Sequence, residues 1–149
     1  MKKIFEVNEY NSEGLDKAIK QIEKDEIACG LICNGKIIAT ATGKGIKPLI
    51  ELCLANANLA EEAVLADKII GRAASFIAIH FGIKAVYGET MSKGGAELLS
   101  EHNIAVAQKI LANEIRNRTN TDICPMDKAV KGMSKADEAF QCLLEKIKH

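Results

Sequence analysis

The chain has 149 residues, of which 48% are hydrophobic, and its 20 basic and 20 acidic side chains give a formal net charge of zero. This length fits a single domain over residues 1–149, and the apolar share is sufficient for a core. A zero net charge removes the simplest argument for a nucleic acid as partner, and the lack of an apolar run of about 18 residues excludes a membrane-spanning helix.

The cysteines and the first residues predict a cytoplasmic location. The chain has five cysteines, an odd number, which is typical of free thiols in a reducing compartment. No long apolar run follows Lys2 and Lys3, so the start of the chain does not resemble a secretory signal.

The chain begins with a predicted helix and a predicted hairpin. Ser12 can cap a helix whose apolar residues repeat at the three-and-four spacing of one helical face, as far as about residue 24. The dipeptide Asn34-Gly35 stands between two apolar runs, which is the strongest short signal for a β-hairpin. We therefore expect two antiparallel strands within residues 27–42.

Two further helices are predicted before the middle of the chain. Pro48 suits the first turn of a helix that ends near residue 57. The run 63–81 is almost entirely apolar and stops at Gly82, a residue that commonly ends helices. We interpret this run as one long helix.

The second half alternates strands and helices. In chain order the pattern predicts a strand over 85–89, a helix over 93–101, a strand over 104–107, a helical turn around 110–115, a loop over 116–122, a short helix over 126–130 opened by Pro125, and a final helix capped by Ser134. Strands joined by helices after an opening hairpin predict a three-layer α/β/α fold with a mixed sheet.

The adjacent pair Asp67 and Lys68 is the most informative feature of the chain, because it interrupts the apolar run 63–81. Charged side chains are rarely buried without a partner. One interpretation is that an acid and an amine face a cleft and contact a polar ligand. The other is an ion pair that ties the helix to a neighbouring loop.

Two residues just beyond this pair favour the cleft. Gly71 would cost about 1 kcal/mol relative to alanine inside a helix, so a backbone or a ligand is expected to approach it closely. Arg72 lies four residues after Lys68, which would add a second cation to the same edge of a helix.

The polar segment 117–127 is expected to form another side of the same site. A thiol at a helix start is favoured as thiolate by the unpaired amides, so Cys124 is either reactive or part of a capping loop. In the capping alternative, Asp127 complements the dipole of the short helix. The polar residues before Cys124, including Arg118, bind either an anionic ligand or one another.

Three weaker signals concern anions and metals. Gly43-x-Gly45 follows a predicted strand, and the lysines at 36, 44 and 47 around it form either a solvated loop or a small anion site. Ser92-Lys93-Gly94-Gly95 opens a helix and is either a plain turn or an anion site. The three histidines are scattered and no Cys-x-x-Cys occurs, so we predict no metal site and no cofactor.

Three motifs in the same order resemble a small bacterial family of unknown function that has a cytidine-deaminase-like fold. They are Gly45-Ile46-Lys47-Pro48-Leu49, the run Ala-Asp-Lys-Ile-Ile-Gly-Arg-Ala-Ala over 66–74, and Cys-Pro-Met-Asp-Lys-Ala-Val over 124–130. The resemblance spans about residues 14 to 145. That family usually has Glu where this chain has Asp127.

The resemblance implies a fold and a pocket but argues against hydrolytic deamination. Deaminases carry zinc at two helix starts, with His-x-Glu or Cys-x-Glu on the helix after the hairpin and Pro-Cys-x-x-Cys on the helix after the third strand. We expect the equivalent positions at 65–68 and 91–95, and neither has the required ligands. A shared fold alone does not carry function.

These observations predict a zinc-independent protein that binds a small molecule of the nucleotide or nucleoside class. If it is an enzyme, Asp67 is the acid–base group and Lys68 its partner. The expected ligand-binding residues are Gly45, Lys47, Asp67, Lys68, Arg72, Ser92, Arg118, Cys124, Pro125, Met126 and Asp127. Two alternatives stay open, namely a non-catalytic regulatory or protein-interaction module and a metal-dependent nucleoside deaminase with unusual ligands. A homo-oligomer is also open, because the run 63–81 suits either a core or an interface.

Overall fold

The computed structural model describes residues 12–148, so the N-terminal residues weighed above as a secretory signal and the histidine at 149 lie outside the described part of the chain. Its elements are α1 (Glu13–Glu23), β1 (Cys29–Cys33), β2 (Lys36–Ala41), α2 (Lys47–Ala55), the 3-10 helix η1 (Ala57–Glu62), β3 (Val64–Ile70), α3 (Arg72–Phe81), β4 (Ala85–Ser92), α4 (Lys93–Glu101), β5 (Ala105–Ala112), α5 (Pro125–Ala129) and α6 (Ala136–Ile147).

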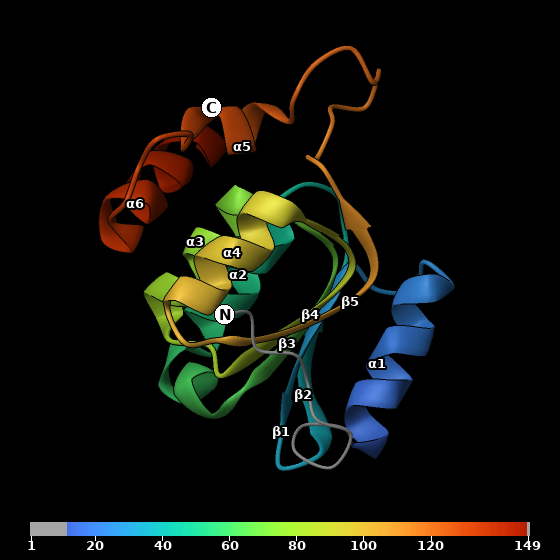
Figure 1. Ribbon diagram of the computed structural model, residues 1–149. Helices are drawn as coiled ribbons and strands as arrows, with labels where there is room; N and C mark the ends of the chain where they lie inside the picture. Colours follow the sequence, from blue (N-terminus) through green and yellow to red (C-terminus); the bar gives the residue numbers. More distant parts are fainter. Residues whose placement is uncertain (1–11, 149) are drawn as a thin grey trace.

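The five strands form one mixed sheet in the order β2-β1-β3-β4-β5. β1 runs antiparallel to both β2 and β3, whereas β3, β4 and β5 are parallel. Figure 1 shows α1 on one face of the sheet and α2, α3 and α4 on the other, and α6 packs on α3. This arrangement confirms the predicted three-layer α/β/α fold.

The sheet is buried on both faces, which divides the core in two. On one face Leu15, Ala18 and Ile22 of α1 pack against alternate strand residues such as Val64 and Ala66. On the other face the larger cluster joins the sheet to α2, α3, α4 and α6. Asp67 follows Ala66, so the alternation of a strand directs its side chain toward the face that α2 and α3 cover.

The first two predictions are confirmed. The hydroxyl oxygen of Ser12 accepts a hydrogen bond from the Leu15 amide at 3.1 Å and caps α1. Asn34 and Gly35 have positive φ angles of 51° and 78°, which are the left-handed values of a tight hairpin turn, and they join β1 to β2.

The prediction of one helix over 63–81 is wrong. Val64–Ile70 is the central strand β3, and α3 begins only at Arg72, with Gly71 as its N-cap residue. A central strand with helices on both faces is apolar without alternation, so its sequence looks like a buried helix. Asp67 and Lys68 therefore lie near the carboxyl end of a strand.

Two smaller predictions are also wrong. The residues around Ile110 do not form a helical turn, because β5 continues to Ala112 along the edge of the sheet. Ser134 does not cap the last helix, whose N-cap residue is Lys135 and which has no side-chain cap. Among the described helices, none has the length and apolar character needed to cross a membrane.

Candidate functional site

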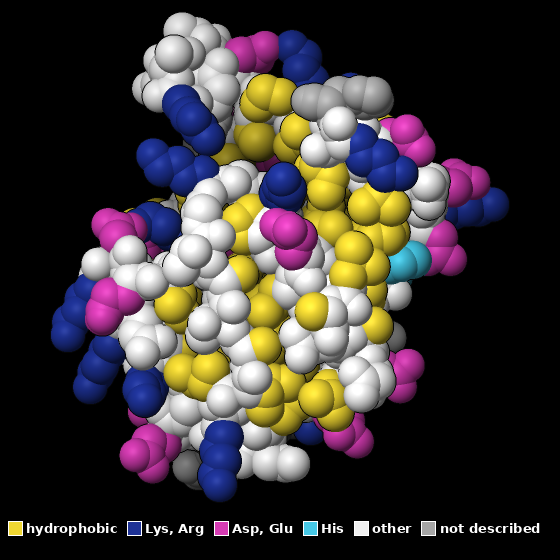
Figure 2. Space-filling model, turned by 180° about the vertical axis from the view of Figure 1, so that it is seen from behind, with side chains coloured by type: hydrophobic (Ala, Val, Ile, Leu, Met, Phe, Trp, Pro, Cys, Tyr) yellow, Lys and Arg dark blue, Asp and Glu magenta, His cyan; other side chains and the backbone are white. Residues whose placement is uncertain are grey.

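A cavity of about 870 Å³ lies beside the carboxyl end of β3 and the starts of α2 and α3. Four segments line it: the turn after α1 (25–28), the loop between β2 and α2 (42–46), the end of β3 with the start of α3 (67–69, 71 and 74), and the C-terminal segment (115–118 and 124–127). In Figure 2 the face seen from behind is hollowed near its top, with hydrophobic side chains in the hollow and Lys and Arg side chains around it.

Asp67 has a carboxyl group whose surroundings move its pKa close to neutral pH. It pairs with Cys29 of β1 and with Gly88 of β4, so it stands in the middle of the sheet. Burial raises the pKa of its carboxyl group to about 7, although hydrogen bonds from the backbone amides of Ile69 and Lys68 act in the opposite direction. Part of the residue stays open to the cavity.

Two buried thiols lie near this carboxyl group. Burial first, and then the negative charge of Asp67, raises the pKa of Cys53 to about 12, and the same causes raise the pKa of Cys29. Both cysteines therefore stay protonated at neutral pH, where they act as small apolar groups.

Lys68 points away from its neighbour, because successive side chains of a strand face opposite sides of the sheet. Its ammonium group binds the carboxylate of Asp25, and that hydrogen bond raises the pKa of Lys68. Lys68 thus lines the cavity and also forms an ion pair with the turn after α1, so its position has a feature of each alternative raised from the sequence, with a strand in place of the expected helix.

The close approach expected at Gly71 is present. Gly71 is not inside a helix, however, but is the N-cap residue of α3, and the group that approaches it is the Asp127 side chain. The Asp127 carboxylate accepts a hydrogen bond from the Ala73 amide at 2.9 Å and so caps α3 from a distant part of the chain. A Cβ atom at Gly71 would lie 2.0 Å from the nearer carboxylate oxygen of Asp127. Asp127 is 7% exposed, and burial raises the pKa of its carboxyl group, although hydrogen bonds from the backbone amides of Ala73 and Arg72 act in the opposite direction.

Eight of the eleven predicted ligand-binding residues line this cavity, and three do not. Gly45, Asp67, Lys68, Arg118 and the run 124–127 lie along it. Lys47 lies at the exposed start of α2, and Arg72 packs instead over Gly94 of α4. The Ser92 hydroxyl accepts the Gly95 amide hydrogen at 3.0 Å and so caps α4, which is the plain-turn alternative.

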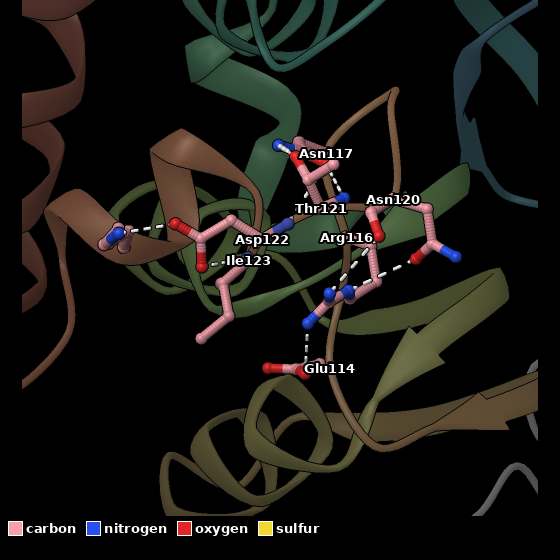
Figure 3. A network of polar contacts seen from close by, with 8 residues as sticks. Glu114, Arg116, Asn117, Asn120, Thr121, Asp122 and Ile123 are labelled. Atoms are coloured by element: carbon pink, nitrogen blue, oxygen red, sulfur yellow. Dashed lines mark hydrogen bonds and ion pairs between the residues drawn. The ribbon is translucent and has the colours of Figure 1, made fainter.

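The segment before α5 is held together by its own polar groups, as Figure 3 shows. The side-chain oxygen of Asn117 accepts the Thr121 amide hydrogen at 2.9 Å, and its amide group donates to the Thr121 hydroxyl at 3.1 Å. Arg116 binds Glu114 at 2.8 Å, and Lys128 binds Asp122 at 2.6 Å. The structure thus supports mutual bonding for most of these residues.

Asn117→Ala is expected to loosen this segment with little effect on the rest of the fold. The variant loses the acceptor for the Thr121 and Asp122 amides, so we expect faster amide hydrogen exchange at both and a loss of global stability below about 1 kcal/mol. Asn58→Ala on exposed η1 is the control. Unchanged exchange at Thr121 would contradict this view of the segment.

Sequence reasoning missed several lining segments. The turn 25–28 and residue Ala74 carry no distinguishing motif, and they join the cavity only because the strand order brings them there. Lys44 could have been predicted, because it is one of the three lysines for which the sequence left a small anion site as an alternative. Of that group, Lys44 lines the cavity and Lys36 and Lys47 do not.

The positions expected for the deaminase zinc ligands also need correction. The helix after the hairpin is α2 and the third strand is β3, so the resemblance points to the starts of α2 and α3 rather than to 65–68 and 91–95. Those starts carry Ile46, Lys47 and Pro48, and Gly71, Arg72 and Ala73, which do not fit zinc. Within residues 12–148, no three His, Cys, Asp or Glu side chains are grouped as a metal site requires.

One family model and two solved structures are similar to this chain. A family model described as a domain of unknown function (DUF1893) matches residues 17–147. A solved DUF1893 family protein from Thermotoga maritima is similar with a TM-score of 0.79 and 19% identity, over 95% of both chains. A diaminohydroxyphosphoribosylaminopyrimidine deaminase/5-amino-6-(5-phosphoribosylamino)uracil reductase from the same organism has a TM-score of 0.48 and 19% identity, over 65% of this chain and 35% of that chain. No curated protein matches this chain in sequence.

Proposed function

This chain belongs to the DUF1893 family of domains of unknown function, and we propose that its cavity binds a small molecule of the nucleoside or nucleotide class without zinc. The observation that carries the proposal is the Asp67 carboxyl group, which lines the cavity with a pKa of about 7. The cavity volume of about 870 Å³ lies within the range of sites for small molecules and cofactors.

A carboxyl group with this pKa suits the edge of a nucleobase. When protonated it donates one hydrogen bond and accepts another, and when ionised it only accepts. Nucleobase edges present neighbouring donors and acceptors, so a carboxyl group that exchanges its proton near neutral pH can match several of them. The apolar residues Ile46, Ala74 and Met126 line the same cavity and offer surface against which a ring can pack.

The same group is suited to acid–base chemistry. A general acid or base works best when its pKa lies near the working pH, and Asp67 meets this condition. If a reaction occurs, we assign the proton transfer to Asp67. Because Lys68 points away from Asp67, we assign it a contact with the ligand rather than with Asp67, and the ligand must compete with Asp25 for the ammonium group.

A thermal-shift screen against nucleosides and nucleotides tests the proposal. Binding to the folded protein raises its Tm by mass action. We expect a shift with one base class in the wild type, an affinity that changes between about pH 6 and pH 8, and a loss of about tenfold or more in Asp67→Asn. Lys68→Ala is measured beside it.

Asp16→Asn is the matched control, because Asp16 lies exposed on α1 and away from the cavity. It should bind as the wild type does. The proposal fails if no nucleoside or nucleotide shifts the wild-type Tm, or if Asp67→Asn binds the same ligand with the same affinity and the same pH dependence.

A further inference from the structure

Four cations line the cavity, and two of them have no partner among the residues that the structure describes. Lys68 binds Asp25, and Arg116 binds Glu114. Within residues 12–148, neither Lys44 nor Arg118 makes an ion pair or a side-chain hydrogen bond, although both line the cavity. Within the described part of the chain, two of the four cations are therefore paired, and Lys44 and Arg118 are available to a ligand.

The lining also contains four acids, and within the described residues none of them pairs with Lys44 or Arg118. Asp25 is occupied by Lys68, and the Asp127 carboxylate is occupied by the backbone at the start of α3. Asp67 and the exposed Glu26 are the other acids of the lining. Arg118 and Lys44 come from two different segments, 115–118 and 42–46, so the free positive charge is offered from both of them.

Arg118 differs from its neighbours in the polar segment. Asn117, Thr119 and Thr121 bond one another, and Asn120 accepts a hydrogen bond from Arg116 at 3.2 Å. The Thr121 amide also donates to the side-chain oxygen of Asn117, so the backbone is held on both sides of Arg118, whose guanidinium group makes no hydrogen bond or ion pair within the described residues. A cation presented by a segment that is already ordered costs less entropy to engage than one on a loose loop.

We infer that the cavity takes a phosphorylated ligand, whose phosphate group is bound by Arg118 and Lys44. This inference rests on the proposed function, and it selects the nucleotide over the nucleoside. A guanidinium group matches two phosphate oxygens with two parallel N–H bonds, and a lysine adds a compact charge. The base then lies toward Asp67, and the phosphate lies at the end of the ligand that reaches Arg118 and Lys44.

Titration calorimetry with AMP, CMP, GMP and UMP and with the four parent nucleosides tests the inference. For the base class that binds, the wild type should prefer the 5′-monophosphate over the nucleoside by about tenfold or more, because charge-assisted bonds to the phosphate are lost in the nucleoside. In Arg118→Ala and in Lys44→Ala this preference should shrink severalfold, while affinity for the nucleoside stays near the wild-type value.

Lys131→Ala is the matched control, since Lys131 is an exposed cation outside the cavity. It should keep the full preference. Equal binding of nucleotide and nucleoside by the wild type, or an unchanged preference in both cavity variants, overturns the phosphate assignment and leaves the proposed function standing. A lack of binding by all eight compounds overturns both.

Discussion

Asp67→Asn is expected to stabilise the protein relative to the wild type as the pH rises. The carboxyl pKa lies at about 7 in the folded protein, against about 3.9 in an unfolded chain. Between these values the folded state holds a proton that the unfolded state has released, so wild-type stability falls with rising pH and levels off above pH 7. Asparagine does not titrate and avoids this loss.

The expected size follows from the linkage relation. From about pH 5 to about pH 8, the unfolding free energy of Asp67→Asn should gain roughly 3 kcal/mol over that of the wild type. Urea unfolding of both proteins at these two pH values measures the change. Asp16→Asn serves again as control, and its difference from the wild type should not vary with pH. A constant difference for Asp67→Asn would show that its carboxyl group is ionised at pH 5.

Gly71→Ala should destabilise the protein by about 3 kcal/mol. The new Cβ atom would meet the Asp127 carboxylate at 2.0 Å, which is far inside van der Waals contact. The carboxylate must move, so α3 loses the cap on the Ala73 amide in addition to the cost of overpacking. Denaturant unfolding measures the loss, and Gly30→Ala is the control because a Cβ atom there meets its nearest neighbour at 3.5 Å.

A double-mutant cycle identifies the cause. The three atoms nearest to the Cβ position of Gly71 all belong to the Asp127 side chain. Asp127→Ala removes them at the cost of the cap, about 1–2 kcal/mol. In that background Gly71→Ala should cost less than about 1 kcal/mol, giving a large interaction energy. Additive losses would mean that the glycine is required for another reason.

The layer architecture was predictable because local signals mark most boundaries. Asn34-Gly35 correctly predicted the hairpin, Ser12 the start of α1, and Gly82 the end of α3. The resemblance of three motifs to a family of unknown function agrees with the family match over 17–147. Each of these signals acts over a few residues, where sequence and conformation are directly linked.

The strand β3 was not predictable by the same means. Its residues are apolar on both faces except at Asp67 and Lys68, and helix α3 follows after the single residue Gly71. Periodicity cannot separate a buried strand from a buried helix, so only the length of the apolar run and the glycines or prolines that flank it can distinguish them. The β-branched residues Val64, Ile69 and Ile70 and the glycine at 71 were the available signs of a strand that ends at residue 70.

The sequence singled out several residues that line one cavity, but it did not indicate how they are arranged. Asp67 and the run 124–127 were both singled out, and they line one cavity. The contact between Gly71 and Asp127 was not foreseen, because it depends on where α5 lies relative to α3. The pairing of Lys68 with Asp25 depends in the same way on the antiparallel position of β1 beside β3.

The cap that Asp127 places on α3 has a consequence for how the sequence can vary. A side chain at position 71 and a carboxylate at position 127 compete for the same space, so the two positions are not free to change independently. Related chains that keep an acid at 127 should keep glycine at 71, and chains with any larger residue at 71 should have lost the acid. Covariation between positions 71 and 127 would therefore result from the one contact between them. It offers a means of recognising relatives whose α3 begins in the same way.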